Sequence, residues 1–195
     1  MRPTRVPLGP GGFQKLTNVS RETLDRLIRY VDLLTAWNAR INLVGRNTVG
    51  DVWRRHLLDS AQIYPRIPQG TRVLIDLGSG AGLPGLILSI LGVPEVHLVE
   101  SDMRKAVFLR EAVRVTGATA SVHALRIDRM KPVVAEVVTA RALAPLSELL
   151  EISERFRGPG TICLFPKGET VREELTDAIK QWKMTAHQSP SLSDP

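Results

Sequence analysis

The chain has 195 residues, the length of one domain with room for a small appended unit. Apolar residues make up 43% of the sequence, an ordinary share for a globular protein with a real hydrophobic core. The single cysteine, Cys163, excludes a disulfide framework, so we expect a reducing, cytoplasmic location. The most apolar run, residues 83–94, is too short and too interrupted by proline and glycine to span a membrane.

The formal net charge of +6 is concentrated in the first third of the sequence. Residues 1–70 hold 11 Lys/Arg and 5 Asp/Glu, whereas residues 71–195 hold 15 of each. A basic cap on a neutral core predicts a polyanionic partner that approaches through the cap. The alternative is a solvated basic surface without a partner.

Proline and glycine dominate residues 1–16, which predicts a flexible arm. A helix is expected next, because Ser20 is a suitable N-cap and apolar residues recur at helical spacing as far as about Asn38. Asp51 is expected to cap a second helix, which Pro65 ends.

Three side chains in the first turns of that second helix are candidates for contacts with RNA: Arg54, Arg55 and His56. His56 is also a candidate for a local proton role. A histidine beside two arginines is, however, more typical of a solvated helix face.

Residues 73–85 read Val-Leu-Ile-Asp-Leu-Gly-Ser-Gly-Ala-Gly-Leu-Pro-Gly. The apolar start predicts a parallel strand buried on both faces. The alternating glycines predict a tight turn in which the backbone approaches a ligand without Cβ atoms in the way. Pro84 suits the first turn of a following helix. Strand, glycine loop and helix together indicate the ligand-binding edge of an open α/β sheet.

Asp76 distinguishes between two ligands for this loop. Residues 80–85 also match the dinucleotide pattern G-x-G-x-x-G, with Glu100 twenty residues after Gly80. The Asp76 carboxylate, however, repels a pyrophosphate and attracts the sulfonium and ammonium groups of S-adenosylmethionine. The sequence therefore favours S-adenosylmethionine as the cofactor. The alternative is that Asp76 only accepts hydrogen bonds from loop amides in another kind of α/β protein.

The remaining sequence alternates strand and helix patterns, with strands expected at residues 95–100, 120–125, 133–140 and 160–165. Regular alternation predicts a doubly wound, mostly parallel sheet with right-handed crossovers. The domain organisation that follows is an arm at 1–16, a basic helical cap at 17–70 and an α/β domain at 71–195.

Charged side chains follow several of these strands. Glu100 can accept hydrogen bonds from ribose hydroxyls, or cap the next helix. Arg126 and Asp128 follow the third strand on the rim where the base of the ligand should lie, although Asp128 alone is compatible with a solvated position. Arg141 ends the fourth strand, where a charge in an apolar run is costly without a partner.

Lys167 after the fifth strand suits a phosphate contact or an ordinary surface turn. The sequence contains no cluster of Cys, His and carboxylate residues with metal spacing, so no metal is expected. It also contains no Pro-Cys pair and no Asn/Asp-Pro-Pro-Tyr/Phe motif, which argues against methylation of pyrimidine carbons through a thiolate and of exocyclic amines. Ring nitrogens, hydroxyls and small molecules remain as targets, and guanine N7 needs no strong general base.

Several motifs in register resemble the bacterial small-subunit rRNA guanine-N7 methyltransferases, also called glucose-inhibited division protein B. They are Trp-Asn at 37–38, Ile-Asn-Leu at 41–43, Arg-His-Leu-Leu-Asp-Ser at 55–60, the glycine segment at 76–85, Leu-Val-Glu-Ser at 98–101, Arg-Lys at 104–105, Arg-Ala-Leu-Ala at 141–144 and Lys-Gly at 167–168.

The resemblance implies a Rossmann-like class I methyltransferase that uses S-adenosylmethionine to methylate a guanine in the 530 loop of 16S rRNA, within the small ribosomal subunit or an assembly intermediate. It implies no membrane association. It also implies catalytic roles for Arg141 and Arg126 near the guanine. The cofactor-binding set is then Asp76, Gly78, Gly80, Leu83, Glu100, Ile127, Asp128 and Arg141, and the RNA-binding set is Arg54, Arg55, His56 and Lys167.

The family usually ends with two antiparallel strands. Residues 183–189 can supply one, but the proline-containing residues 190–195 cannot supply the other, so an edge strand is expected to be missing. Two alternative functions remain open at this point: a small-molecule methyltransferase, and a non-catalytic rRNA-binding assembly factor that retains a cofactor pocket.

Overall fold

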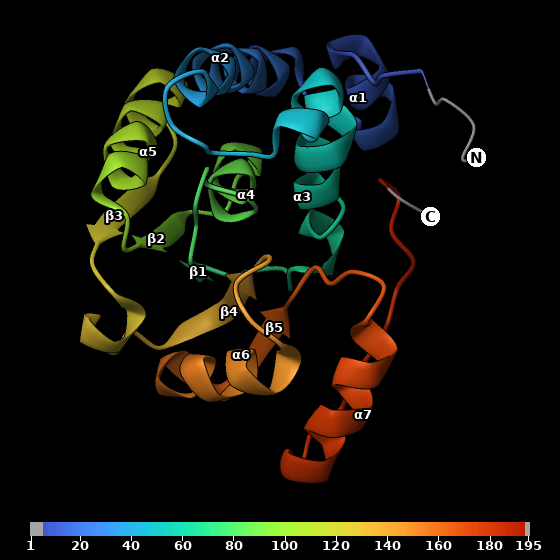
Figure 1. Cartoon of the computed structure of the whole chain (residues 1–195), viewed down its shortest axis with the longest axis vertical. Coiled ribbons are helices and arrows are strands. Elements are labelled where there is room, and N and C mark those ends of the chain that lie inside the picture. The colour runs from blue at the N-terminus through green and yellow to red at the C-terminus, as the bar shows by residue number, and fades with distance from the viewer. Residues whose placement is uncertain (1–5, 194–195) are drawn as a thin grey trace.

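A computed structural model describes residues 6–193 and contains a five-stranded parallel sheet between two layers of helices (Figure 1). The strand order is β3-β2-β1-β4-β5, and every neighbouring pair is parallel. The predicted doubly wound α/β fold is therefore confirmed. The strands are β1 (Val73–Leu77), β2 (Glu95–Glu100), β3 (Ala120–Ala124), β4 (Ala135–Ala140) and β5 (Arg157–Leu164).

The direction of winding reverses at β1. From β1 the chain adds β2 and β3 on one side and then crosses back to add β4 and β5 on the other. The carboxyl ends of β1 and β4 are adjacent, with Asp76 opposite Thr139 and Leu77 opposite Ala140. In open α/β sheets such a reversal opens a crevice outside the strand ends, which is where ligands bind.

Each face of the sheet has its own hydrophobic cluster because side chains alternate along every strand. Leu74 packs into the cluster shared with α4 (Gly85–Leu91) and α5 (Met103–Thr116), whereas Ile75 packs into the cluster shared with α6 (Leu146–Ser153). Beyond β5 the chain forms α7 (Val171–Gln181), which packs against α6. Among the helices described in residues 6–193, none is long and apolar enough to cross a membrane.

The N-terminal helices α1 (Pro10–Thr17) and α2 (Arg21–Asn38) extend the first cluster. Helix α2 lies over α4 and α5, whereas α1 packs against α2 (Figure 1). Ser20 caps α2 as predicted, with its hydroxyl accepting a hydrogen bond from Thr23 N at 3.1 Å. The prediction of a flexible arm is wrong for residues 10–16, since they belong to α1 and Phe13 is fully buried. Residues 1–5 of the predicted arm lie outside the described residues.

The predicted second helix is not a regular α-helix. The chain forms a 3-10 turn η1 (Arg46–Asp51), a π-helical turn η2 (Trp53–Leu58), a short α3 (Asp59–Ala61) and a second 3-10 turn η3 (Tyr64–Arg66). Asp51 ends η1, and its carboxylate accepts a hydrogen bond from Leu8 N at 2.8 Å. π-Helical turns are rare and occur frequently at functional sites.

The possible strand at residues 183–189 is absent, because this segment leaves α7 without pairing to the sheet. It runs toward α3, where Leu192 N donates to Gln62 Oε1 at 2.6 Å and Ser193 Oγ donates to Asp59 Oδ1 at 2.8 Å. Within the described residues the sheet therefore ends at β5.

Candidate functional site

The glycine loop after β1 needs its glycines. Gly78, Gly80 and Gly82 adopt positive φ values of 67°, 56° and 86°, a region that residues with a Cβ rarely enter. A Cβ on Gly78 would also lie 2.8 Å from Leu143 Cδ1. From α2, the buried Tyr30 hydroxyl donates a hydrogen bond to the loop carbonyl of Ala81 at 2.8 Å. The loop is thus fixed by backbone geometry and by a contact from the N-terminal helices.

A cavity of about 630 Å³ opens between the glycine loop, the end of β2, the turn η4 (Ile127–Arg129) and the loop after β4. Its apolar walls include Val99 and Leu125. Six of the predicted site residues line it: Gly78, Gly80, Glu100, Arg126, Ile127 and Asp128. Leu83 does not, because its side chain is buried in the core beneath the loop.

Glu100 lies at the centre of the loops that border this cavity. Its Oε2 accepts a hydrogen bond from Gly80 N at 2.8 Å, and its Oε1 accepts one from Asp102 N at 2.7 Å. Each carboxylate oxygen has a further lone pair with which to accept a ligand hydroxyl. The capping role belongs to Asp102, whose Oδ1 accepts from Arg104 N at 2.8 Å at the start of α5.

Asp76 is fully buried and does not line the cavity. Its Oδ1 accepts a hydrogen bond from Thr139 Oγ1 at 2.7 Å, whereas Oδ2 has no hydrogen-bond partner. The carboxylate points toward the start of α4, because a Cβ on Gly85 would lie 2.8 Å from Asp76 Cγ. Burial raises the pKa of Asp76 to about 6, despite the opposing effects of its hydrogen bonds and of Arg141. Direct contact between Asp76 and a cofactor therefore stays a prediction.

Arg126 and Asp128 pair with each other on the exposed rim of the cavity, with Arg126 Nη2 3.2 Å from Asp128 Oδ2. The hydrogen bonds from Arg126 hold the pKa of Asp128 below its usual value. Arg155, which the sequence analysis missed, donates to the carbonyls of Asp128 at 2.7 Å and Met130 at 2.8 Å. No local motif marks Arg155, because its partners lie more than 20 residues away in the sequence.

Arg141 forms an ion pair, as expected for a charge next to an apolar strand. Its side chain lies on the side of β4 that faces the N-terminal helices. Its Nη1 lies 3.0 Å from Asp59 Oδ2, and its Nη2 lies 3.3 Å from His56 Nδ1. Asp59 belongs to the motif at residues 55–60, but its sequence neighbours alone do not mark it as the partner of Arg141. Burial, followed by the nearby Arg141 charge, lowers the pKa of His56 to about 4, so the ring is neutral at pH 7.

Arg54 and Lys167, both predicted to bind RNA, make ion pairs within the protein. Arg54 Nε lies 3.3 Å from Asp51 Oδ2, and Lys167 pairs with Glu174 at 2.5 Å while donating to Ala144 O at 2.9 Å.

The other two differ in exposure. Arg55 is exposed on η2, whereas His56 is buried rather than on a solvated helix face. Within residues 6–193, no group of three or more His, Cys, Asp or Glu side chains is arranged to hold a metal ion.

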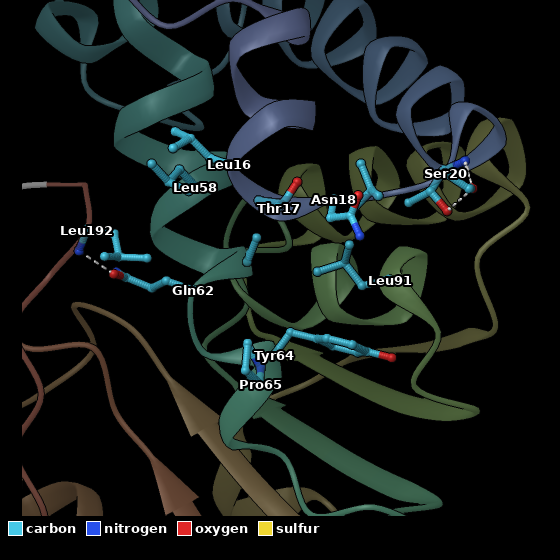
Figure 2. A pocket seen from close by; sticks show the side chains of 13 residues that line it. Leu16, Thr17, Asn18, Ser20, Leu58, Gln62, Tyr64, Pro65, Leu91 and Leu192 are labelled. Carbon is cyan, nitrogen blue, oxygen red and sulfur yellow. Dashed lines mark hydrogen bonds between the residues drawn. The ribbon is translucent and has the colours of Figure 1, made fainter.

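A second hollow of about 340 Å³ lies among α1, α3 and the end of α4 (Figure 2). Leu16, Leu58, Leu91 and Tyr64 contribute to its wall, and Leu192 closes one side through its hydrogen bond to Gln62. None of its lining side chains is charged, and none belongs to the predicted site. The chemistry predicted from the sequence therefore lies in the first cavity and around Arg141.

Comparison with known proteins decides the family. The family described as "GidB: rRNA small subunit methyltransferase G" matches residues 23–193. The chain belongs to this family. The "Ribosomal RNA small subunit methyltransferase G" of Rhodospirillum centenum is 60% identical over 183 residues, which cover 94% of this chain and 85% of that relative. Its counterpart in Paramagnetospirillum magneticum is 54% identical over 188 residues, covering 96% and 92%.

Solved structures support the fold of this methyltransferase G family member at much lower identity. A ribosomal protein L11 methylase from Lactobacillus delbrueckii subsp. bulgaricus superposes with a TM-score of 0.56 at 14% identity, covering 74% of this chain and 75% of that one. A putative O-methyltransferase from Klebsiella pneumoniae gives 0.56 at 13% identity, covering 88% and 82%. The Rossmann-like methyltransferase fold predicted from the sequence is confirmed.

Proposed function

We propose that this protein transfers a methyl group from S-adenosylmethionine to N7 of a guanine in the 530 loop of 16S rRNA, within the small ribosomal subunit or an assembly intermediate. The observation that carries the proposal is family membership across residues 23–193, with relatives named rRNA small subunit methyltransferases up to 60% identical. The cavity at the carboxyl ends of the strands has the composition that this chemistry requires.

The residues around the cavity fit S-adenosylmethionine. In this proposal Glu100, which borders the cavity, accepts the ribose hydroxyls, and the apolar walls at Val99, Leu125 and Ile127 contact the adenine ring. A Cβ on Gly78 would collide with the side chain of Leu143, which also lines the cavity, so glycine at this position keeps the loop close to Leu143. Asp76 supplies a buried carboxylate with one unpartnered oxygen behind the loop, which favours a cationic ligand over a pyrophosphate.

When bound, S-adenosylmethionine supplies an electrophilic methyl group; its transfer to N7 breaks the S–CH₃ bond and leaves the electron pair on sulfur. N7 of guanine carries a free lone pair, so no side chain has to remove a proton. The protein's task is to align the base with the methyl group and to exclude water. Arg141 at the end of β4, and Arg126 on the rim, are the residues we assign to holding the guanine or its phosphates.

The RNA approaches through the basic N-terminal region in this proposal. Arg54 and Arg55 lie on η2 beside the segment that holds Arg141, and Lys167 lies behind the loop after β4. Salt-dependent binding of phosphates by such residues fixes the register of the RNA without reading its sequence.

The test uses a strain from which the gene is deleted. Small subunits and naked 16S rRNA from this strain are incubated with the purified protein and methyl-labelled S-adenosylmethionine, and the modified nucleoside is mapped by mass spectrometry. We expect 7-methylguanosine in the 530 loop, with small subunits or their precursors the better substrate. Label in small molecules alone, or no label at all, would contradict the proposal. Calorimetry adds an independent check, since NAD and ATP should bind far more weakly than S-adenosylmethionine.

A further inference from the structure

The side chain of Arg141 is held entirely from one direction. Its guanidinium contacts Asp59 at 3.0 Å and His56 at 3.3 Å, and both partners come from the turn of η2 and α3. These partners precede Arg141 by 82 and 85 residues. The side chains of Arg141 and Asp59 are each about one-fifth exposed, so the pair is shielded from water on most sides.

The carboxylate of Asp59 is itself oriented. Oδ2 meets Arg141, whereas Oδ1 accepts hydrogen bonds from Gln62 Nε2 at 3.0 Å and from Ser193 Oγ at 2.8 Å. An arginine side chain loses about 2 kcal/mol of rotamer entropy when it becomes fixed. A partner that is already oriented fixes Arg141 before any substrate arrives.

The hydrogen bonds of His56 determine its tautomer. The hydroxyl of Thr48 donates its one hydrogen to Gly45 O at 2.7 Å, so at 2.8 Å it accepts a hydrogen from His56 Nε2. The opposite ring atom, Nδ1, is then unprotonated and accepts from Arg141 Nη2, which can only donate. The ring therefore acts as a neutral second acceptor for the guanidinium.

We propose that Asp59 and His56 are positioning residues that hold the guanidinium of Arg141 at the carboxyl end of β4, ready for the methyl acceptor. This inference rests on the proposed function, because it assigns the placement of a residue used in that reaction. It also assigns His56 to the active site instead of to the RNA-binding surface. The segment formed by η2 and α3 thereby builds part of the active site in addition to meeting the RNA.

The first experiment tests the contact between His56 and Arg141 without requiring the methyl-transfer reaction. Long-range ¹H–¹⁵N spectra of the ligand-free protein report which nitrogen of the His56 ring carries hydrogen. We expect the Nε2–H form at pH 7. A ring protonated on Nδ1 would overturn the proposal, because that atom would then be unable to accept from Arg141.

The second experiment is a double-mutant cycle on the single-turnover rate at saturating S-adenosylmethionine and small subunits. Asp59→Asn should lower the rate about 10- to 100-fold in the wild-type background. In the Arg141→Ala background the same change should alter the rate less than about 2-fold, because the residue through which it acts is gone. Equal losses in both backgrounds, or an unchanged rate in the first, would overturn the assignment.

Histidine variants keep the test informative if Asp59→Asn folds poorly. His56→Asn places an oxygen near the former Nδ1 and should retain more activity than His56→Gln, which lacks an acceptor at that point. The reverse order would contradict the proposal. Asp32→Asn, at an exposed carboxylate on α2, is the matched control and should leave the rate unchanged.

The two proposals fail in different ways. A wild-type protein that leaves guanine N7 unmodified overturns the proposed function, and the His56 spectrum still decides whether the contact with Arg141 exists. A wild-type protein that methylates N7 while Asp59→Asn matches its rate overturns only the positioning role.

Discussion

The two halves of the site are built in different ways. On the β1–β2 side, the glycine loop is fixed by backbone conformation and by Glu100, which bonds to Gly80 N and Asp102 N. On the β4 side, Arg141 depends on a charged and a polar side chain from η2 and α3. The first half depends mainly on residues close in sequence, with one hydrogen bond from Tyr30 of α2 to the carbonyl of Ala81, whereas the second is assembled only when distant segments pack. If this contrast is functional, the two halves should respond differently to mutation and to pH.

The largest effect is expected at Arg141. Arg141→Ala should lower the single-turnover rate about 10²- to 10³-fold, because it removes a fixed charge next to the reacting groups. Folding stability should change only modestly, since the side chain is partly exposed and Asp59 keeps its bonds to Gln62 and Ser193. An unchanged single-turnover rate would refute the catalytic assignment and with it the contrast between the two halves.

The β1–β2 side of the site, which contains the glycine loop, should lose stability when a single methyl group is added. A Cβ on Gly85 would lie 2.5 Å from Asp76 Cβ and 2.7 Å from Leu98 Cδ2, so Gly85→Ala should destabilise the fold by about 1–3 kcal/mol. Urea unfolding measures this loss. Gly50→Ala is the control, because nothing lies within 4 Å of its added Cβ and its stability should change by less than about 0.5 kcal/mol. Equal stabilities for the two variants would show that the loop is not tightly packed.

The two halves should respond to pH with opposite signs. His56 has a pKa of 6.5 when unfolded and about 4 when folded, so the unfolded chain binds more protons between these values. This contribution to stability is present above pH 6.5 and is lost as the pH falls toward 4. Asp76 has a pKa raised from 3.8 to about 6, so its contribution is present below pH 3.8 and is lost as the pH rises through 6.

Unfolding measured from pH 4 to 6.5 separates these contributions, each at most about 1.4 kcal/mol per pH unit. Relative to wild type, the stability of His56→Asn should rise less with pH, and that of Asp76→Asn should rise more. If both variants shift the slope in the same direction, one of the two burial effects is absent.

A smaller effect is expected where α2 joins the α/β domain. Arg26 donates to the carbonyls of Thr116 at 2.7 Å, Gly117 at 3.1 Å and Ile90 at 3.3 Å, at the ends of α5 and α4. Arg26→Met should cost about 1–2 kcal/mol of unfolding free energy, because these carbonyls lose a charged donor. Cofactor affinity should not change. A loss of affinity in calorimetry would show that this junction also shapes the cavity.

Local sequence predicted the parallel sheet and the glycine loop well, because apolar strands and glycines with positive φ leave a pattern within a few residues. It failed where packing decides the conformation. Residues 10–16 have the composition of a flexible segment, yet they form a helix, because burial of Phe13 in the core stabilises it. The turn that carries His56 reads as an ordinary helix, but it forms a π-helical turn and faces inward.

The sequence by itself determined the fold class, the glycine loop and the family, because each produces motifs of residues that are adjacent in the sequence. Only the tertiary structure decided which groups meet: Arg141 with Asp59 and His56, Arg155 with the carbonyl of Asp128, and Asp76 with Thr139 instead of the cavity. The reason is physical. Arg155 and Asp128 are 27 positions apart, and the other contacts join residues more than 60 positions apart. Hydrogen bonds over such separations form only when the packed core brings the elements together.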